Sequence, residues 1–254
     1  FDKLGDFKNG YAYFTENGLY GFVSKSGAVY PARYEWISDF DETGLAIVRQ
    51  GGKYGLVAAN GRLVFEPVYD LVLKTRHPVY LLMVGNQYGF YSSDKCFITG
   101  IQYDYAMEKP IDFYTDGQLF KLLKKGAPAL MDKNGQMLTS FGQFEELHFF
   151  SGDLMLVKKK NRYGYVDRKM NLVIPYKYSD ADDFSQGIAI VSKGDKQMLI
   201  NREGKEIFST SHDLERLGKK FFLLDGGRKD VINAQGEVIF SDVAEIQKSS
   251  ASNY

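Results

Sequence analysis

An internal repeat of about 34 residues is the feature that most constrains the fold of this chain. A tyrosine followed by glycine recurs, and each copy is followed by a turn position; the pairs are Tyr20-Gly21, Tyr54-Gly55, Tyr88-Gly89 and Tyr163-Gly164. Weaker copies keep the turn and lose the pair, and the seven turn positions are Gly27, Gly61, Lys95, Gly135, Met170, Gly204 and Gly236. These positions are 34, 34, 40, 35, 34 and 32 residues apart. The chain therefore contains about seven copies of one structural unit.

The composition of each copy indicates strands rather than helices. A period of about 34 residues is also that of the helical tetratricopeptide repeat. Here, however, glycine recurs at intervals of about ten residues inside each copy, which would break both helices of that unit. The segments between the glycines are short and apolar, as in Leu45-Ala46-Ile47-Val48 and Leu63-Val64-Phe65. Strands have such lengths and helices are longer, so the sequence predicts an all-β fold.

The second copy predicts three short strands in each unit, at residues 45–49, 53–58 and 63–65. Asn60-Gly61 is a hairpin-turn dipeptide, because both residues tolerate positive φ. Pro67 is expected to end the pairing, since proline cannot donate a ladder hydrogen bond. The Tyr69-Asp70 segment is then expected to cross to the next unit.

The predicted architecture is an open, twisted array of short antiparallel strands in tandem repeats, in which each unit contacts mainly its neighbours. A closed β-propeller is the alternative, because the copy number suits seven blades. Propeller blades normally have four strands and about 40 or more residues, and the uneven spacing of 32 to 40 residues favours the open array. We expect a single β-repeat domain over residues 1–248 and a disordered tail at 249–254. The units are expected at residues 5–35, 36–70, 71–104, 105–140, 141–180, 181–210 and 211–241.

The order of these landmarks resembles the bacterial WG repeat family. Residues 44–70 carry Gly-Leu-Ala-x-Val, Lys-aromatic-Gly-x-Val, Asn-Gly and Pro-x-x-Tyr-Asp segments in sequence, and residues 153–180 carry them again. Tyr-Gly replaces the Trp-Gly of the family in every strong copy, and Trp36 lies elsewhere. The resemblance implies a bacterial protein that is exported or surface-associated and that binds partners.

The tyrosine–glycine pairs are interpreted as structural positions. A strand glycine permits close approach, so we expect the ring of one unit to pack over the bare backbone of its neighbour. Over Gly55 we expect a ring or backbone. A ladder of aromatic rings that stack on a ligand is the alternative.

Acidic clusters at Asp39-Phe40-Asp41-Glu42 and Asp180-Ala181-Asp182-Asp183 occupy the same phase of the repeat. Calcium binding requires several oxygen ligands, but the Asp-x-Asp-x-Asp-Gly loop pattern is absent from the sequence. We expect connecting turns in which the acids cap backbone amides.

No catalytic, cofactor-binding or metal-binding residue is predicted. The sequence has no phosphate-binding loop, dinucleotide fingerprint or Gly-x-Ser-x-Gly elbow. Cys96 is the single cysteine, and no histidine lies at a spacing that would suit a thiol nucleophile. The chain is therefore expected not to be an enzyme. A hydrolase that acts on envelope polymer with paired carboxylates is the alternative.

Charge and hydropathy exclude two classes of partner. Lys+Arg 32 balances Asp+Glu 32, whereas a dedicated nucleic-acid binder needs a basic excess. No apolar stretch approaches the ~20 residues of a membrane span. The function expected is non-catalytic protein or glycan binding, or assembly, at the bacterial cell envelope. We expect an extracytoplasmic location, in the periplasm or at the cell surface, because the resemblance points to export and a first residue other than Met is compatible with a removed leader. A cytoplasmic scaffold is the alternative.

Overall fold

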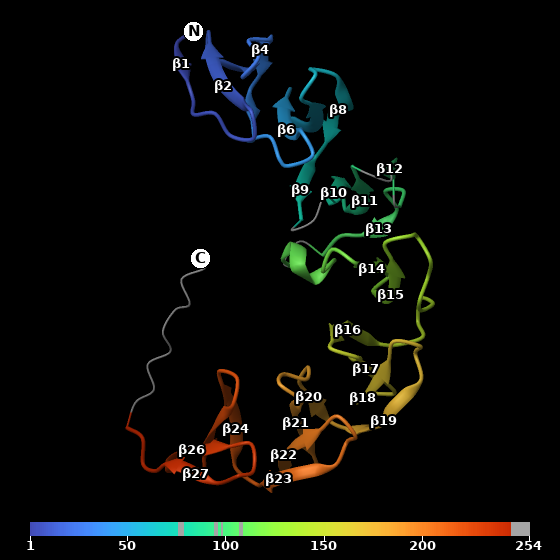
Figure 1. Cartoon of the computed structure of the whole chain (residues 1–254). Coiled ribbons are helices and arrows are strands. Elements are labelled where there is room, and N and C mark those ends of the chain that lie inside the picture. Colours follow the sequence, from blue (N-terminus) through green and yellow to red (C-terminus); the bar gives the residue numbers. More distant parts are fainter. Residues whose placement is uncertain (76–78, 94–95, 98, 107–108, 245–254) are drawn as a thin grey trace. The chain divides into compact units, whose positions relative to one another are not determined.

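The computed structural model describes residues 1–75, 79–93, 96–97, 99–106 and 109–244 (Figure 1). Apart from the three-residue 3₁₀ helix η1 (Ile111–Phe113), its regular structure within these ranges consists of strands. The predicted all-β tandem-repeat fold is confirmed by seven antiparallel sheets that follow one another along this part of the chain. The turn position Lys95 and the predicted tail at 249–254 lie outside the described residues. No helix found in these ranges is long and apolar enough to cross a membrane.

The chain divides into two compact units. The N-terminal unit comprises Phe1–Gly126 with Leu130–Met137, and the C-terminal unit comprises Ala127–Ala129 and the residues from Leu138 onward. Each unit is built from sheets of short strands in chain order.

The N-terminal unit begins with three sheets. The first sheet contains β1 (Lys3–Leu4), β2 (Tyr11–Glu16), β3 (Leu19–Ser24) and β4 (Val29–Tyr34). The second sheet contains β5 (Trp36–Ile37), β6 (Leu45–Gln50), β7 (Lys53–Ala58) and β8 (Leu63–Tyr69). The third sheet contains β9 (Leu71–Lys74), β10 (Val79–Val84), β11 (Gln87–Ser92), β12 (Cys96–Phe97) and β13 (Tyr103–Asp104). The fourth sheet is the hairpin β14 (Leu119–Lys124) and β15 (Ala127–Asp132), of which Ala127–Ala129 is counted with the C-terminal unit.

The C-terminal unit contains three sheets of four strands. The fifth sheet has β16 (Glu146–Ser151), β17 (Leu154–Lys159), β18 (Arg162–Asp167) and β19 (Leu172–Tyr178). The sixth sheet has β20 (Asp180–Ala181), β21 (Ile188–Lys193), β22 (Lys196–Asn201) and β23 (Glu206–Thr210). The seventh sheet has β24 (Asp213–Leu217), β25 (Phe221–Asp225), β26 (Lys229–Asn233) and β27 (Val238–Phe240).

The expectation of three strands in each unit is wrong, because a fourth, outer strand opens most sheets. In the second sheet this strand is β5, in which Trp36 pairs with Arg49 and Ile37 with Val48. It follows directly from the tyrosine–acid segment that leaves the first sheet. A strand of two residues is too short to show a period of two, so the sequence pattern gave no sign of it. Four strands are also usual for a propeller blade, so strand number does not separate the open array from the ring.

Pro67 does not end its strand, which corrects a second expectation. Leu56 pairs with Phe65 and Tyr54 pairs with Tyr69, so the register of β7 against β8 shifts around the proline and pairing then resumes. This is a β-bulge, a position at which a strand tolerates a residue without an N–H group. The bulge bends β8 and places its backbone close to β7.

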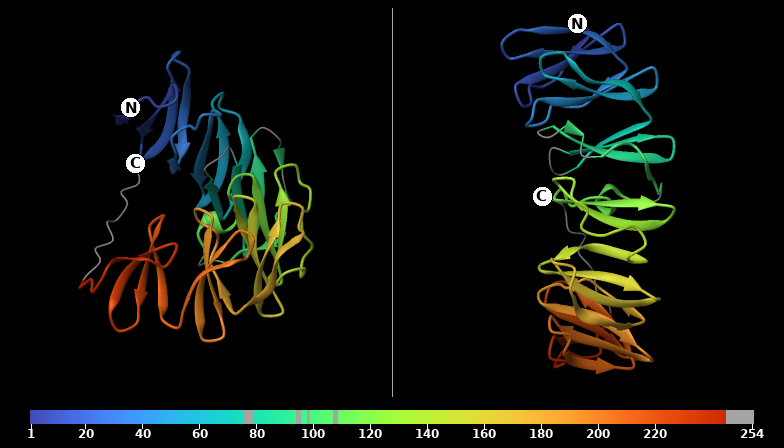
Figure 2. Two further views of the ribbon diagram at one scale, coloured as in Figure 1. Left: turned by 60° about the horizontal axis from the view of Figure 1, so that its bottom comes forward. Right: turned by 90° about the vertical axis from the view of Figure 1, so that its right-hand side faces the viewer.

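The core of the N-terminal unit consists of sheet faces packed against each other. Alternate residues of β6 face opposite ways: Ala46 and Val48 pack with residues of the first sheet, and Leu45 packs with residues of the third. The second sheet is therefore covered on both faces, and the N-terminal sheets lie in succession in both views of Figure 2. One repeat cannot bury its apolar faces alone, so each sheet depends on its neighbours.

The C-terminal unit repeats this packing. The fifth and sixth sheets share a cluster that includes Tyr165, Tyr178 and Phe184. The sixth and seventh sheets share a second cluster that includes Leu199 and Phe222. The sixth sheet is therefore the interior layer of this unit.

A recurrent hydrogen bond ties an acidic residue that directly follows an aromatic residue to the next hairpin. An acidic side chain accepts from the backbone amide of a hairpin-tip residue whose φ is positive. The pairs of acid and amide are Asp2 and Asn17, Glu35 and Gly52, Asp70 and Gly85, Asp104 and Lys125, and Glu145 and Asn161. The Asp70–Gly85 bond is 2.7 Å long, and the Glu145–Asn161 bond is 3.0 Å long.

Candidate functional site

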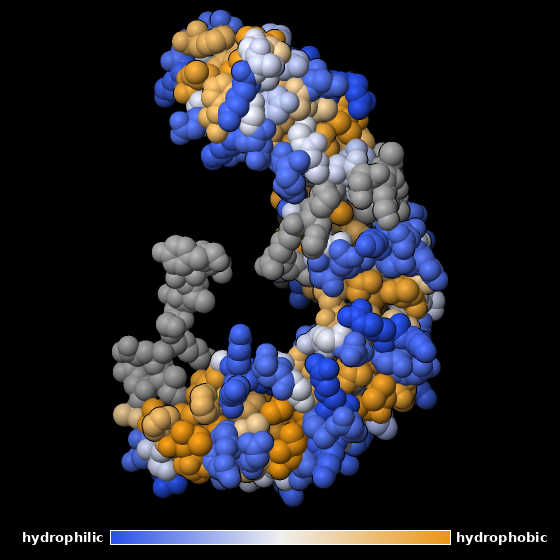
Figure 3. Space-filling model, viewed as in Figure 1, coloured by the Kyte–Doolittle hydropathy of each residue, from blue (hydrophilic) through white to orange (hydrophobic). Residues whose placement is uncertain are grey.

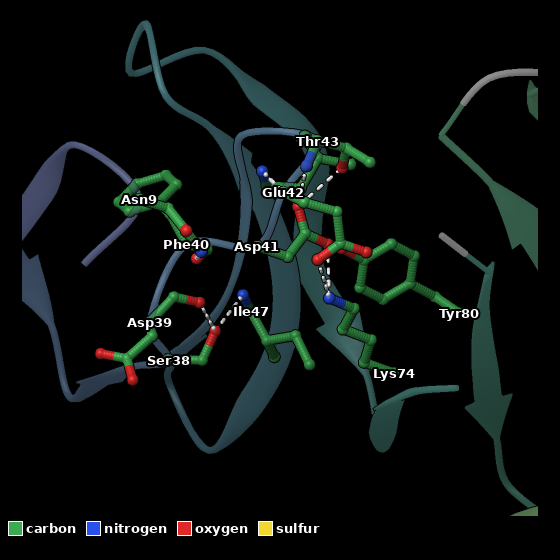
Figure 4. Close-up of polar contacts among 11 residues, drawn as sticks. Asn9, Ser38, Asp39, Phe40, Asp41, Glu42, Thr43, Ile47, Lys74 and Tyr80 are labelled. Carbon is green, nitrogen blue, oxygen red and sulfur yellow. Dashed lines mark hydrogen bonds and ion pairs between the residues drawn. The ribbon is translucent and has the colours of Figure 1, made fainter. Parts of the chain in front are cut away.

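Loop and strand residues of the first three sheets meet in the N-terminal unit and line a polar hollow. Residues about one repeat period apart become neighbours there. Lys8 Nζ lies 2.8 Å from Asp39 Oδ2, and Lys74 Nζ lies 3.0 Å from Glu42 Oε2. The polar hollow has a volume of about 380 Å³ and is lined by Asn9, Ser38, Asp39, Phe40, Asp41, Glu42, Leu45, Ile47, Lys74 and Tyr80 (Figure 4).

The carboxylate of Asp41 organises the floor of the polar hollow and is only 7% exposed. Its Oδ1 accepts hydrogen bonds from the Thr43 amide (2.9 Å), the Thr43 hydroxyl (2.7 Å) and the Leu45 amide (3.1 Å). Its Oδ2 accepts a hydrogen bond from the Tyr80 hydroxyl of β10 and lies 3.3 Å from Lys74 Nζ of β9. This carboxylate therefore joins the second sheet to the third.

The charges of the polar hollow are fixed by these contacts. Burial alone would raise the pKa of Asp41, but hydrogen bonds from Thr43, Tyr80 and two amides outweigh it and lower the pKa below the ordinary value. A backbone hydrogen bond and Lys74 likewise lower the pKa of Glu42. Burial, together with the neighbouring Asp41, raises the pKa of Tyr80. At neutral pH both acids are ionised and the phenol keeps its proton.

The two predicted acidic clusters differ in structure. In the first, Asp41 caps the amides of Thr43 and Leu45, as expected of a connecting turn. In the second, Asp183 Oδ2 lies 2.9 Å from Nδ1 of His148. Burial raises the pKa of Asp182, and the charge of Arg216 opposes this shift. No group of three or more His, Cys, Asp or Glu side chains within the described ranges is arranged to hold a metal ion.

The predicted tyrosines Tyr20, Tyr54, Tyr88 and Tyr163 lie outside the polar hollow, each on a middle strand of its own sheet. Each is paired across the ladder with the tyrosine that ends or follows the next strand. The pairs are Tyr20 with Tyr34, Tyr54 with Tyr69, Tyr88 with Tyr103, and Tyr163 with Tyr178. Tyr88 is fully buried, whereas Tyr20, Tyr54 and Tyr163 are half-buried.

The predicted glycines Gly21, Gly55, Gly89 and Gly164 sit where the next strand crosses closely over them. A Cβ atom on Gly55 would lie 2.7 Å from the Phe65 carbonyl oxygen, and the other three would each meet a carbonyl oxygen at 2.6 Å. The covering group is thus the backbone of the same sheet, joined at Gly21 by the Phe14 ring of that sheet. The expectation of a ring from a neighbouring unit is wrong, and of the ring or backbone expected over Gly55 it is backbone that lies there. The bulge brings this backbone into the space that glycine leaves free.

The sequence interpretation did not single out Asn9, Lys74 or Tyr80. The signal that could have found two of them is the repeat period itself. Asn9 Nδ2 donates to the Phe40 carbonyl 31 residues away, and Lys74 donates to Glu42 32 residues away. The side chain of Cys96 and the whole of His77 lie outside the described part of the chain.

Comparison with known proteins confirms the resemblance to the WG family. The model of the WG containing repeat matches residues 1–20, 20–54, 130–163 and 163–196. Residues 55–129 and 197–254 fall outside these matches. No curated protein matches the chain significantly in sequence.

Solved structures show only a weak likeness in fold. Kluyveromyces lactis Hsv2 with loop 6CD replaced by a Gly-Ser linker is 10% identical, with a TM-score of 0.46 over 83% of this chain and 80% of that chain. BamB from Moraxella catarrhalis is 13% identical, with a TM-score of 0.35 over 92% of this chain and 82% of that chain. Likenesses at this level carry no argument about what this chain binds.

Proposed function

We propose that the chain is a non-catalytic β-repeat module that binds a protein partner through the polar hollow, with a basic side chain of the partner entering it. The observation that carries this proposal is the exposed acidic rim. The side chains of Asp39 and Glu42 are 45% and 63% exposed. Three carboxylates line the polar hollow, and two lysines contact them: Lys8 pairs with Asp39, and Lys74 pairs with Asp41 and Glu42, so one negative charge remains in excess. Complementary charge of this kind steers association and fixes register more than it adds affinity.

The character of the lining supports a protein rather than a small molecule or a glycan. Small-molecule pockets are mostly apolar with a few polar groups, whereas six of the ten lining residues here are polar or charged. The two aromatic rings, Phe40 and Tyr80, are 4% and 1% exposed, so neither offers a face on which a sugar could stack. A glycan is the second candidate ligand, and the binding experiment below includes it.

The acids of the polar hollow do not suit the hydrolase alternative. A general acid near neutral pH needs a raised pKa, and those of Asp41 and Glu42 are lowered. Asp182, whose pKa is raised, does not line the polar hollow. These directions leave the polar hollow without a general acid.

Affinity capture from bacterial envelope and cytosolic extracts tests the proposal. We expect the parent chain to enrich one protein, the variant Glu42→Lys to lose it, and salt to weaken the capture because an exposed charge contact is screened. Asp153→Lys is the matched control, since Asp153 is 82% exposed and does not line the polar hollow. Equal capture by all three chains would place the binding surface elsewhere, and binding of purified envelope polysaccharide that Glu42→Lys abolishes would favour the glycan.

We further propose an extracytoplasmic location, at the bacterial cell envelope, on the strength of the WG resemblance. Fractionation of the native host decides between this and the cytoplasmic scaffold. Recovery of the protein with periplasmic and surface markers is expected, and recovery with cytosolic markers alone would defeat the envelope proposal.

A further inference from the structure

A second hollow lies in the N-terminal unit, where the first sheet meets the second, and we call it the hydroxyl hollow. Its volume is about 380 Å³, and its lining comes from the ends of strands and from the turns beside them. Over these two sheets, at the top of Figure 3, residues of intermediate hydropathy lie among apolar and hydrophilic ones. Five of the lining residues are alanine, glycine or leucine, and the six polar ones are Tyr11, Ser24, Ser26, Tyr30, Thr43 and Asn60.

The lining has the composition of a site for a small neutral ligand. Such sites have volumes of about 300–1,000 Å³ and combine apolar and aromatic residues with a few polar groups. None of the eleven lining residues carries a charge. A charged ligand would therefore lose its hydration without gaining a partner of opposite charge. The polar hollow differs in this respect, because three carboxylates line it.

The fifth sheet shows that the repeat does not itself require a neutral lining. Ser24 ends β3 as Asp167 ends β18. Both side chains accept a hydrogen bond from the main-chain amide four residues further along the chain. Ser26 then corresponds to Lys169. The same turn thus carries an acid and a lysine in the fifth sheet, and two hydroxyl groups in the first.

Several polar groups of the lining are free to bind a ligand. The hydroxyls of Tyr11 and Tyr30 have no hydrogen-bond partner among the residues that the structure describes. Asn60 Oδ1 accepts a hydrogen bond from a main-chain amide (3.1 Å), which leaves its Nδ2 group as a donor. The Thr43 hydroxyl donates to Asp41 Oδ1 (2.7 Å), so its oxygen is left to accept. The lining therefore offers a donor, an acceptor and two phenols that can do both.

The main-chain amides around the hydroxyl hollow are, in contrast, already bonded. Five lining residues donate their amides within the N-terminal unit: Ser24, Ala28, Gly44, Ala58 and Ala59. An extended peptide that adds to a sheet binds through main-chain hydrogen bonds to a free strand edge. The free groups here belong to side chains, which favours a ligand rich in hydroxyl groups over a peptide.

We propose that the hydroxyl hollow binds one ring of a neutral saccharide. The hydroxyl groups of a sugar both donate and accept hydrogen bonds, as the free groups of the lining do. Its C–H groups can lie against the alanine and leucine side chains. Among their described lining residues the two hollows share only Leu45. Saccharide binding here and protein binding at the polar hollow can therefore be tested separately.

A glycan array followed by isothermal titration calorimetry tests this proposal. The probes are neutral and acidic oligosaccharides, and the neutral one that binds best is then titrated. We expect the parent to bind neutral oligosaccharides. Ala28→Trp should abolish binding, because Ala28 is an exposed residue of the lining and an indole there fills the hollow. Asn60→Asp keeps the oxygen that accepts within the turn and removes the donor. The affinity should then fall about threefold to tenfold, the range for one hydrogen bond.

Two substitutions at equivalent turn positions are the matched controls. Lys205→Trp matches Ala28→Trp, because the amide of each residue donates to the side chain four residues earlier. Gln235→Glu matches Asn60→Asp, because each residue precedes the turn glycine of its sheet. Neither control residue lines the hydroxyl hollow, so both variants should bind as the parent does. Glu203 occupies the same turn position in the sixth sheet, so an acid is compatible with this turn, and circular dichroism checks that every variant is folded.

Glu42→Lys separates this proposal from the proposed function. It should leave saccharide binding unchanged while it abolishes capture of the protein partner, and Ala28→Trp should do the reverse. Three outcomes would overturn the saccharide proposal: a parent that binds no neutral oligosaccharide, binding that Glu42→Lys removes, and binding that Ala28→Trp retains at the affinity of the parent. If Ala28→Trp loses the protein partner and no chain binds a saccharide, the hydroxyl hollow belongs to the protein interface instead.

Discussion

Replacing Gly55 by alanine tests the close crossing of β8 over β7. A Cβ atom at this position would lie 2.7 Å from the Phe65 carbonyl oxygen, 2.8 Å from the Pro67 nitrogen and 3.0 Å from the Glu66 carbonyl carbon. All three are main-chain atoms, so no side chain can rotate away. The bulge itself must shift, and the pairing of Tyr54 with Tyr69 is the contact at risk.

The expected loss of stability follows from two opposing effects. Overpacking a well-packed site costs about 1–3 kcal/mol, and we expect the upper part of this range because backbone must move. Alanine also reduces the freedom of the unfolded chain, which offsets about 0.4–1 kcal/mol. The net destabilisation is therefore about 2 kcal/mol, equivalent to a fall in Tm of about 4–8 °C. Valine at Gly55 should cost more, since its branched side chain needs still more of the same space.

Urea and thermal unfolding followed by tryptophan fluorescence measure this effect directly. Trp36 is the single tryptophan and lies on β5, in the same sheet as Gly55. Gly100→Ala is the matched control, because the nearest atom to its added Cβ, Gln102 Nε2, is 3.9 Å away. If Gly55→Ala unfolds like the parent, or if Gly100→Ala is equally destabilised, the argument from the close crossing is refuted.

Three further predictions concern buried polar groups and overall dimensions. Tyr88→Phe should destabilise the N-terminal unit by about 1–3 kcal/mol in urea unfolding, because the lost hydroxyl donates to the Lys121 carbonyl (2.7 Å) and accepts from the Leu123 amide (3.2 Å); no loss would mean that these groups find other partners. The lowered pKa of Asp41 contributes stability that is fully present above pH ~4 and is lost as the pH falls through the folded-state pKa. The free energy of unfolding of Asp41→Asn should therefore fall less steeply with decreasing pH than that of the parent. An equal slope at acid pH in the two chains would contradict this. The open array predicts a radius of gyration above the compact value of about 18 Å in small-angle scattering, and a value near 18 Å would favour the closed ring.

The second copy shows how far sequence reasoning reaches. Strands were expected at residues 45–49, 53–58 and 63–65, and β6, β7 and β8 occupy Leu45–Gln50, Lys53–Ala58 and Leu63–Tyr69. Short apolar runs between glycines identify such strands well, because period and turn chemistry are local properties. The extension of β8 through Pro67 was missed, since a bulge depends on the partner strand and leaves no local pattern.

The candidate site was less accessible from the sequence. Asp41 was singled out as one acid of a cluster, but its partners Lys74 and Tyr80 lie in the following repeat. Which side chains meet across two sheets depends on the packing between them, and alternation within one strand does not determine it. Only the rule that residues about one period apart become neighbours would have joined Asn9 to Phe40 and Lys74 to Glu42.

The hydrogen bonds between acids and hairpin tips bear on how such a chain can change over time. The donor is a main-chain amide, so the bond requires a left-handed backbone at the tip and asks little of the side chain there. Asn17, Gly52, Gly85, Lys125 and Asn161 all meet that requirement. The sequence of a copy can therefore diverge while its backbone conformation is kept. The third sheet does so: it retains the Asp70–Gly85 bond and the Tyr88–Tyr103 pair, although residues 55–129 are outside the family match. The backbone geometry of a repeat is therefore retained after its sequence motif has diverged, and a count of this repeat from sequence alone will miss diverged copies.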